Sequence, residues 1–583
     1  MSSSATIDPI KVSVIANALD AITKEMGETM LRTSRSPIFS EARDFVTSIF
    51  DREARLVAQT HYIPVIGGST PYAMAAIAER AGDDVAEGDA WILNDPYRGN
   101  NHPPDVVIVR PVFHEGEHRF WVMAKGHNAD VGGGGVAGYN PRARDAWEDA
   151  LRIPPVRIMR EDELVRDVWD MIMLNTRVNF LVEGDLNCQL GAARLGARRM
   201  SEFLTRFDPA VVDAAINQIF DASERQVAEK IVAIPDGVYS GEARIDHDGI
   251  DLDVQPTVRL TIRVDGDRIE YDFTDSDDQT KGYLNSSLPN TISSSHLSFF
   301  ALFGADIRYN DGATRPITVT TRKGSIANPI EPAPTTNCTV STCEAMTEAA
   351  WLALSDAIPE WVDAPWARWC APATMGINPR TGRPFSDIHF MSKGGGGATQ
   401  GFDGWDHIGP VICLGGIRSP DPELHELVTP YEVLEYELLP DSAGAGRWRG
   451  GLGVRYRWRV LADGIPCANF GSGNRPETAP VGVCGGLRGI QYNMSIRRAD
   501  GTDEPMDANQ FYELNIGDEV LIESSGGGGY GPPEERDPAS LEADVRDGVV
   551  SEEAARRDYG FDPGAGNGHA GSGAVPVETV GVS

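Results

Sequence analysis

The chain has 583 residues, of which 41% are hydrophobic and 24% charged, so wholesale disorder and collagen-like repetition are excluded and several domains are expected. The 86 acidic residues outnumber the 52 basic ones, and a formal charge of −34 argues against a nucleic-acid partner, because most of such a surface repels phosphate groups. Seven cysteines are too few for a disulfide framework. Neither a long apolar membrane span nor a signal-peptide pattern is visible. We therefore expect a cytoplasmic protein.

The first predicted element is a helix over about residues 9 to 33. Asp8 is a suitable N-cap and Pro9 fits the first turn. Apolar residues then recur at spacings of three and four. Short β-type runs follow at 45–50, 56–59, 91–93, 106–113 and 120–124, and helical patterns resume over about 164–206 and 210–233. These patterns predict a mixed α/β domain over residues 1–235.

Strand patterns dominate the second part of the chain. Two β-type runs at 258–264 and 268–273 are separated by Asp265-Gly266, which predicts a hairpin. A helix is expected at 341–357, and residues 376–521 are typical of turns and short strands.

The sequence pattern changes again after the strand-rich part of the chain. Helical spacing at 540–559 and a Gly-rich close predict a C-terminal helix followed by a disordered tail. The expected fold is therefore multidomain α+β. Its parts are a mixed α/β, metal-binding region 1–235, a β-rich region 236–520 and a terminal region 521–583.

The densest group of chemically active side chains lies between residues 94 and 135. It contains His102, Asp105, His127 and Asp130. His102 and Asp105 bracket two prolines, and in a polyproline conformation positions i and i+3 project from the same side. If the two flanking β-type runs pair as an antiparallel hairpin centred near Gly116, Asp105 faces His127, give or take one or two residues.

Two imidazoles and one carboxylate form the donor set of a mononuclear site with open positions, which suits Mn, Fe, Zn or Co. Such an ion lowers the pKa of a bound water or polarises a carbonyl group. Asp130, a short turn after His127, is the candidate catalytic residue, as an orienting group or proton acceptor. The alternative is that these residues cap loops beside a sheet edge.

Other features of the sequence are weaker indicators of function. No P-loop motif is present, so ATP is not expected to bind through one here. Glycine runs at 132–135, 394–397 and 526–529 are either anion-binding nests or sites of close backbone packing or flexible turns, and we favour the second interpretation. Four other histidines are either pocket residues or ordinary core and surface residues: His61, His296, His389 and His407.

Several motifs, in order along the chain, resemble the hydantoinase B/oxoprolinase family. They are SEARDFVTSIFDREARLVAQ at 40–59, NDPYRGNNHPPD at 94–105, GHNADVGG at 126–133, EGDLNCQLGA at 183–192, RWRGGLGV at 447–454 and SSGGGGYGPPEERDP at 524–538. The resemblance covers nearly the whole chain. This family contains the large second subunits of ATP-dependent hydantoinases, oxoprolinases and lactamases, and it is related to the alpha subunit of acetone carboxylase.

The resemblance also implies site residues. In the acetone carboxylase relatives, a metal site of the form H-x-x-D followed by a later His corresponds to His102, Asp105 and His127 here. Asn128 departs from the family pattern, because a second His is common at that position. The implied cofactor is one divalent ion, manganese, zinc or iron.

The resemblance further implies a division of labour in a hetero-oligomer. A hydantoinase A-type partner uses ATP to phosphorylate the carbonyl oxygen of a small cyclic amide, and the present chain hydrolyses the activated intermediate with a metal-bound water. One alternative is the alpha-type subunit of an ATP-dependent acetone or acetophenone carboxylase. Another is a non-catalytic scaffold for the ATP-using subunit. The sequence leaves the substrate and the stoichiometry open.

Overall fold

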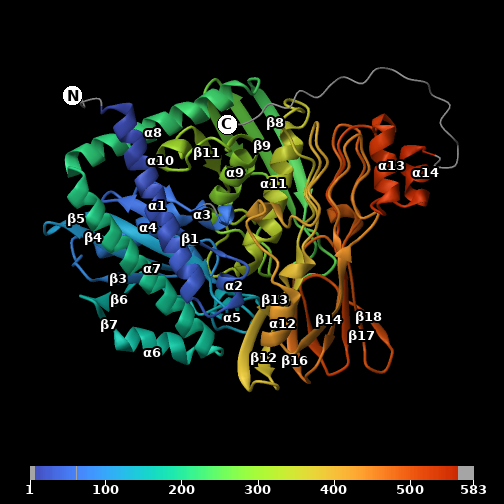
Figure 1. The fold of residues 1–583 in the computed structure, drawn as a ribbon, viewed down its shortest axis with the longest axis horizontal. Coiled ribbons are helices and arrows are strands. Elements are labelled where there is room, and N and C mark those ends of the chain that lie inside the picture. Colours follow the sequence, from blue (N-terminus) through green and yellow to red (C-terminus); the bar gives the residue numbers. More distant parts are fainter. Residues whose placement is uncertain (1–6, 61, 562–583) are drawn as a thin grey trace.

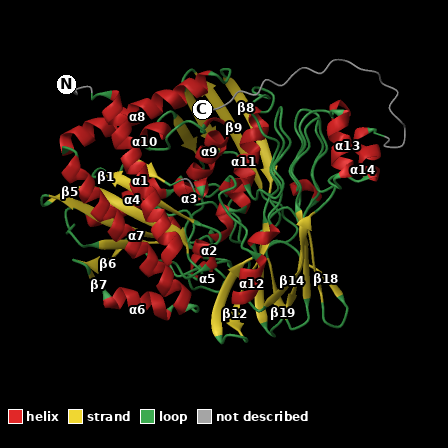
Figure 2. Ribbon diagram, in the orientation of Figure 1, coloured by secondary structure: helices red, strands yellow, loops and turns green. Residues whose placement is uncertain are grey.

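The computed structural model describes residues 7–60 and 62–561 (Figure 1). His61 and the predicted C-terminal tail lie outside the described residues. Helices and strands alternate through the first half, and strands and long loops dominate the second, apart from two terminal helices (Figure 2). This arrangement confirms the mixed, multidomain α+β class. Among the described residues, no helix is both long and apolar enough to cross a bilayer.

The first sheet has seven antiparallel strands in the order β2-β1-β5-β4-β3-β6-β7. Its central strands are buried along most of their length, which explains their nearly continuous apolar sequence. The bounds are β1 (Phe45–Asp51), β2 (Leu56–Gln59), β3 (Ala90–Leu93), β4 (Asp105–His114), β5 (Glu117–His127), β6 (Val156–Arg160) and β7 (Glu163–Leu164).

Helices cover both faces of this sheet. Helices α1 (Pro9–Thr33) and α7 (Asn179–Arg206) pack together on one face (Figure 1), while α4 (Thr70–Ala81) contributes to a separate apolar cluster on the other. Helix α1 is as predicted, since the Asp8 carboxylate accepts from the Ile10 N–H at 3.0 Å and the apolar stripe is largely buried. Helix α8 (Pro209–Val232) packs against α1.

The helix predicted over 164–206 is in fact two helices. Helix α6 (Arg166–Leu174) ends before α7 begins. Between them, the Arg177 backbone N–H donates to the Asp130 carboxylate at 2.5 Å instead of joining a helix. Three shorter helices lie earlier in the chain: α2 (Pro37–Ser40), α3 (Pro64–Gly67) and α5 (Ala146–Asp149).

The second sheet has the order β11-β10-β9-β8, and β10 and β11 are parallel. The predicted hairpin is confirmed, since Asp265 on β9 pairs with Arg268 on β10. Helix α11 (Ser341–Leu354) packs on β8 and β9 and against α9 (Leu288–Phe303), and it ends slightly before the predicted residue 357. The remaining bounds are β8 (Gly237–Arg244), β9 (Thr257–Asp265), β10 (Arg268–Asp272), β11 (Ile317–Thr320) and α10 (Asp311–Thr314).

Two further antiparallel sheets build the β-rich part, in the orders β13-β12-β16-β19 and β14-β15-β20-β17-β18. A second apolar core draws residues from both. The bounds are β12 (Cys370–Asn378), β13 (Arg383–Ile388), α12 (Pro422–Val428), β14 (Tyr431–Leu438), β15 (Val454–Val460), β16 (Ile465–Gly471), β17 (Asn493–Arg497), β18 (Asp503–Pro505), β19 (Gln510–Leu514) and β20 (Glu519–Glu523).

The single helix predicted over 540–559 is two, α13 (Pro538–Arg546) and α14 (Glu552–Tyr559). The chain turns at Gly548, whose φ of +74° is a left-handed conformation that favours glycine and stops a helix. Figure 1 shows both helices at the end of the molecule opposite the first sheet.

The glycine runs are sites of close backbone packing, one of the two forms that the favoured interpretation allowed. The Gly451 N–H donates to the Gly396 carbonyl at 2.8 Å, and the Gly527 N–H donates to the Gly451 carbonyl at 2.9 Å. A Cβ on Gly527 would lie 2.0 Å from the Gly396 oxygen. In the first run, a Cβ on Gly133 would lie 2.6 Å from the Asp149 oxygen.

One apolar core runs from α1 to β16 and therefore crosses residue 235. The predicted boundary falls in the short connection between α8 and β8. The division of the chain into three domains stays a prediction.

Candidate metal centre

The site is built on the β4–β5 hairpin, in which Asp105 and His127 are direct cross-strand partners. This is the register expected from the sequence. The hairpin turns at Glu115 and Gly116. One irregularity in the pairing near Val112 and Phe113 does not change the register at the open end of the hairpin, where Asp105 and His127 lie. Both side chains therefore project from the same end of the sheet.

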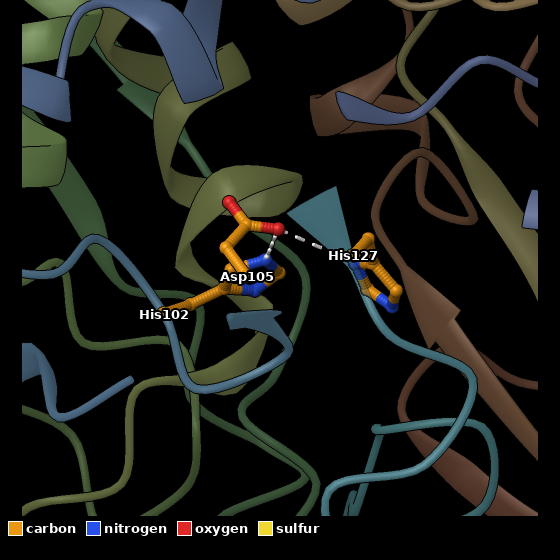
Figure 3. A group of neighbouring side chains, drawn as sticks. All are labelled: His102, Asp105 and His127. Carbon is orange, nitrogen blue, oxygen red and sulfur yellow. Dashed lines mark ion pairs between the residues drawn. The ribbon is translucent and has the colours of Figure 1, made fainter. Parts of the chain in front are cut away.

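His102 reaches the same point through a turn, and the predicted polyproline conformation is wrong. The Asp105 N–H donates to the His102 carbonyl at 3.3 Å, so the two prolines occupy the middle of a tight turn. The turn still brings positions i and i+3 together. His102 Nε2 lies 2.9 Å from Asp105 Oδ1 (Figure 3).

The structure thus gathers three of the four predicted site residues. His127 Nδ1 lies 3.8 Å from Asp105 Oδ1, and one ligand atom from each of His102, Asp105 and His127 lies within 4.8 Å of the others. All three side chains are buried. Figure 3 shows both rings beside the Asp105 carboxylate, the two histidines coming from different segments.

The surroundings of His102 make its Nε2 atom available. His102 Nδ1 lies 2.7 Å from the Thr336 carbonyl, which only accepts, so this nitrogen carries the proton. In the neutral ring, Nε2 then presents a lone pair toward the carboxylate. Asp105 Oδ1, the atom that both imidazoles face, has no hydrogen-bond donor among the described residues. A buried carboxylate oxygen left unsatisfied between two imidazole nitrogens fits a bound cation.

Burial and neighbouring charges shift the pKa values of Asp105 and His127. Burial opposes ionisation of Asp105, but the charges of His102, Lys125 and His127 lower the pKa of this carboxyl below its usual range. Burial and His102 lower the pKa of His127 to about 3, so its ring is neutral at neutral pH. The Asn101 amide donates to Asp105 Oδ2 at 2.6 Å and orients the carboxylate. An ionised carboxylate and two neutral imidazoles are the forms that bind metals.

A second carboxylate beside His127 was missed by the sequence reasoning. Asp44 directly precedes β1, its carbonyl accepts from the His127 N–H at 3.0 Å, and its Oδ2 atom lies 3.9 Å from His127 Nδ1. Burial and the charge of Asp105 raise the pKa of Asp44 well above its usual value. The only signal in the sequence was the position of Asp44 within the first of the family motifs.

Asp130 has a different set of contacts. Its Oδ1 accepts from the Arg177 guanidinium at 2.6 Å and from the Gly132 N–H at 3.1 Å, and its Oδ2 accepts from the Arg177 backbone N–H. The carboxylate is fully buried. Asp130 therefore anchors the loop after His127 to the break between α6 and α7, and it does not join the trio.

A cavity of about 400 Å³ lies between α3 and α9, and no residue of the trio lines it. Its wall includes Gly68, next to Ser69, whose hydroxyl accepts from Lys125 Nζ at 2.7 Å. Burial lowers the pKa of Lys125 to about 8, against the opposing charge of Asp105. The cavity wall combines apolar side chains such as Leu297 and Phe300 with polar ones, including His296, one of the four further histidines.

The hydantoinase B/oxoprolinase family profile matches residues 8–533. The chain belongs to this family. The beta subunit of caprolactamase from Pseudomonas jessenii is 35% identical over 564 residues, covering 95% of this chain and 96% of that one. The B-type subunit of a putative D-/L-hydantoinase from Pseudomonas sp. is 29% identical, with 95% of each chain covered.

The same relationship is seen in three dimensions. The crystal structure of ATP-dependent caprolactamase from Pseudomonas jessenii superposes with a TM-score of 0.89 at 34% identity, covering 97% of this chain and 98% of that one. This hydantoinase B/oxoprolinase family member therefore shares its whole fold with a solved relative.

Proposed function

We propose that this family member is the B-type, or beta, subunit of an ATP-dependent cyclic-amide hydrolase and works in a hetero-oligomer with an A-type ATP-using partner. The observation that carries the proposal is the buried convergence of His102, Asp105 and His127. It occurs in a chain 35% identical to the beta subunit of a caprolactamase. Hydrolysis of a lactam, a hydantoin or 5-oxoproline fits both facts.

The proposed division of labour follows from amide chemistry. Resonance makes a cyclic amide a poor electrophile, so water attacks it slowly. Phosphorylation of its oxygen by the partner makes the carbon more electrophilic and gives it a good leaving group. A divalent ion held by the trio, manganese, iron or zinc, would supply Lewis-acid activation of water or of a carbonyl group.

The chain's own groups hold this site in a reactive state. The Thr336 carbonyl fixes the tautomer of His102, and the Asn101 amide fixes the Asp105 carboxylate. Asp44, with its raised pKa and its position beside His127, is the proposed proton acceptor or donor. The cavity between α3 and α9 is the proposed site of the substrate ring.

The test is to purify the chain with its A-type partner and to measure ring opening of a lactam, 5-oxoproline and a hydantoin, coupled to ATP turnover. We expect turnover of at least one of them, and its loss in His102→Ala. His114→Ala is the matched control and should stay active, because His114 lies beside the turn of the hairpin, at the other end of β4 from Asp105. Failure with all three substrate types would contradict the proposal.

Two rival functions predict different results in the same assay. A ketone carboxylase subunit would require bicarbonate and consume a ketone. A scaffold would keep full turnover after His102→Ala, Asp105→Ala or His127→Ala, whatever its metal content.

A further inference from the structure

A second group of metal-binding side chains lies in the β-rich part. Asp387 is near the end of β13, His389 follows that strand, and His425 is on α12. One ligand atom from each lies within 4.8 Å of the others, and all three residues are buried. The proposed function does not use these residues.

The distances within this group are too long for hydrogen bonds. Asp387 Oδ2 lies 3.5 Å from His389 Nε2 and 3.8 Å from His425 Nδ1. Two atoms that bind one zinc ion at about 2.1 Å, with tetrahedral angles, are about 3.4 Å apart. The observed spacing is therefore close to that of ligands around a shared ion.

The group also contains polar atoms that no protein contact satisfies. Asp387 Oδ2, the atom that faces both rings, is buried and has no hydrogen-bond partner among the described residues. The same is true of His425 Nε2, although it is Nδ1 of that ring that lies 3.8 Å from Asp387. Asp387 is only 4% exposed and His425 only 3%. A buried carboxylate oxygen without a partner is unfavourable, because burial has removed it from water, so such an atom calls for a partner.

The packing around His389 places its Nε2 atom 3.5 Å from both Asp387 Oδ2 and the Thr374 hydroxyl. His389 Nδ1 lies 3.2 Å from the Tyr456 hydroxyl, and the ring stacks on Trp458 with centroids 4.3 Å apart. Contacts of this kind hold ligand histidines in one orientation. Tyr456 and Trp458 belong to the second apolar core, which surrounds the group with aromatic side chains.

We propose that Asp387, His389 and His425 form a second divalent-cation site, with a nitrogen-rich donor set that suits zinc. Its role is structural, because it lies among apolar side chains and ties the end of β13 to α12. The same strand supports the first site, since the Ser386 hydroxyl donates to the Ala129 carbonyl at 2.7 Å in the loop after His127.

The decisive experiment uses the full chain carrying His102→Ala and His127→Ala, which removes the first site and leaves the second intact. After growth with zinc and extensive dialysis, elemental mass spectrometry should find about one metal equivalent per chain, against about two in the unmodified protein. A dialysed double variant without metal would overturn the proposal.

A second measurement does not depend on the folding of any variant. Crystals of the unmodified chain, measured on both sides of the zinc absorption edge, should show an anomalous peak between Asp387, His389 and His425. Absence of that peak in zinc-grown protein would also overturn the proposal.

A complementary pair of variants assigns the ligands. Asp387→Asn should lose one metal equivalent. His407→Gln should lose none, because its ring nitrogens face the Lys393 carbonyl and the Ser419 and Tyr436 hydroxyls and are not part of the cluster. Equal metal content in all proteins would count against the site.

Discussion

Asp105 and His127 occupy directly opposed positions on β4 and β5. Their separation is therefore set by the hydrogen-bond ladder of the central strands and not by a loop. His102 is fixed to the same strand by a tight turn and to Thr336 by its ring nitrogen. Side chains held on rigid elements in this way lose little conformational entropy when they bind an ion.

Asp105→Asn is expected to remove the ion while keeping the hairpin. The amide is nearly isosteric but lacks the charge that a divalent cation needs, so metal content and turnover should both fall by about 100-fold or more. Elemental analysis and the coupled ring-opening assay measure the two effects. Asn101→Ala, which frees Asp105 Oδ2, should give a smaller loss, of about tenfold. Full occupancy in Asp105→Asn would show that the carboxylate is not a ligand.

Asp44→Asn is expected to separate chemistry from metal binding. If Asp44 transfers a proton, kcat should fall by about 100-fold or more and the pH–rate profile should lose one limb, while metal content stays unchanged. Asp51→Asn is the matched control, since Asp51 is a buried carboxylate at the other end of β1 and pairs with Arg55. An unchanged pH profile in Asp44→Asn would remove Asp44 from the mechanism.

Arg177→Met is expected to act on stability. It leaves the Asp130 carboxylate buried without its guanidinium, which should lower the free energy of unfolding by about 3 kcal/mol. Urea unfolding followed by tryptophan fluorescence measures this loss. The double variant Asp130→Asn/Arg177→Met should recover part of it, because no charge then stays unpaired. A kcat effect of Asp130→Asn at unchanged stability would instead support the catalytic role expected from sequence.

Gly527→Ala is expected to prevent stable folding, because its Cβ would meet the Gly396 oxygen at 2.0 Å. The loss should exceed about 3 kcal/mol, since backbone on both sides has to move. Gly191→Ala is the control: this helical glycine has no atom within 4 Å of an added Cβ. Calorimetry should show it unchanged or stabilised by about 0.5–1 kcal/mol.

The lowered pKa of Lys393 predicts that the stability of the protein depends on pH. Burial lowers the pKa of Lys393 to about 8, from an ordinary value of 10.5. Between these values the unfolded chain holds a proton that the folded chain has lost, so this group makes stability rise with pH. Urea midpoints measured from pH 7.5 to 10 should therefore rise relative to those of Lys393→Met. A constant difference between the two proteins would show that Lys393 is not perturbed.

The sequence could predict the hairpin pairing because its two strands and their turn are continuous in the chain. It could not place Asp44, which reaches His127 only through the pairing of β1 with β5, a contact between distant segments. The contacts of Asp130 were equally hidden, because Arg177 reaches it from a break between two helices. The cluster at Asp387 forms only when the end of β13 meets α12, and local sequence patterns do not predict such contacts between distant segments.

The uninterrupted apolar core from α1 to β16 bears on how the protein can be produced. A fragment that ends at residue 235 would expose apolar surface that, in the whole chain, packs against residues beyond 235. Separately expressed halves should therefore precipitate alone, and only synthesis in the same cell would let them reassemble.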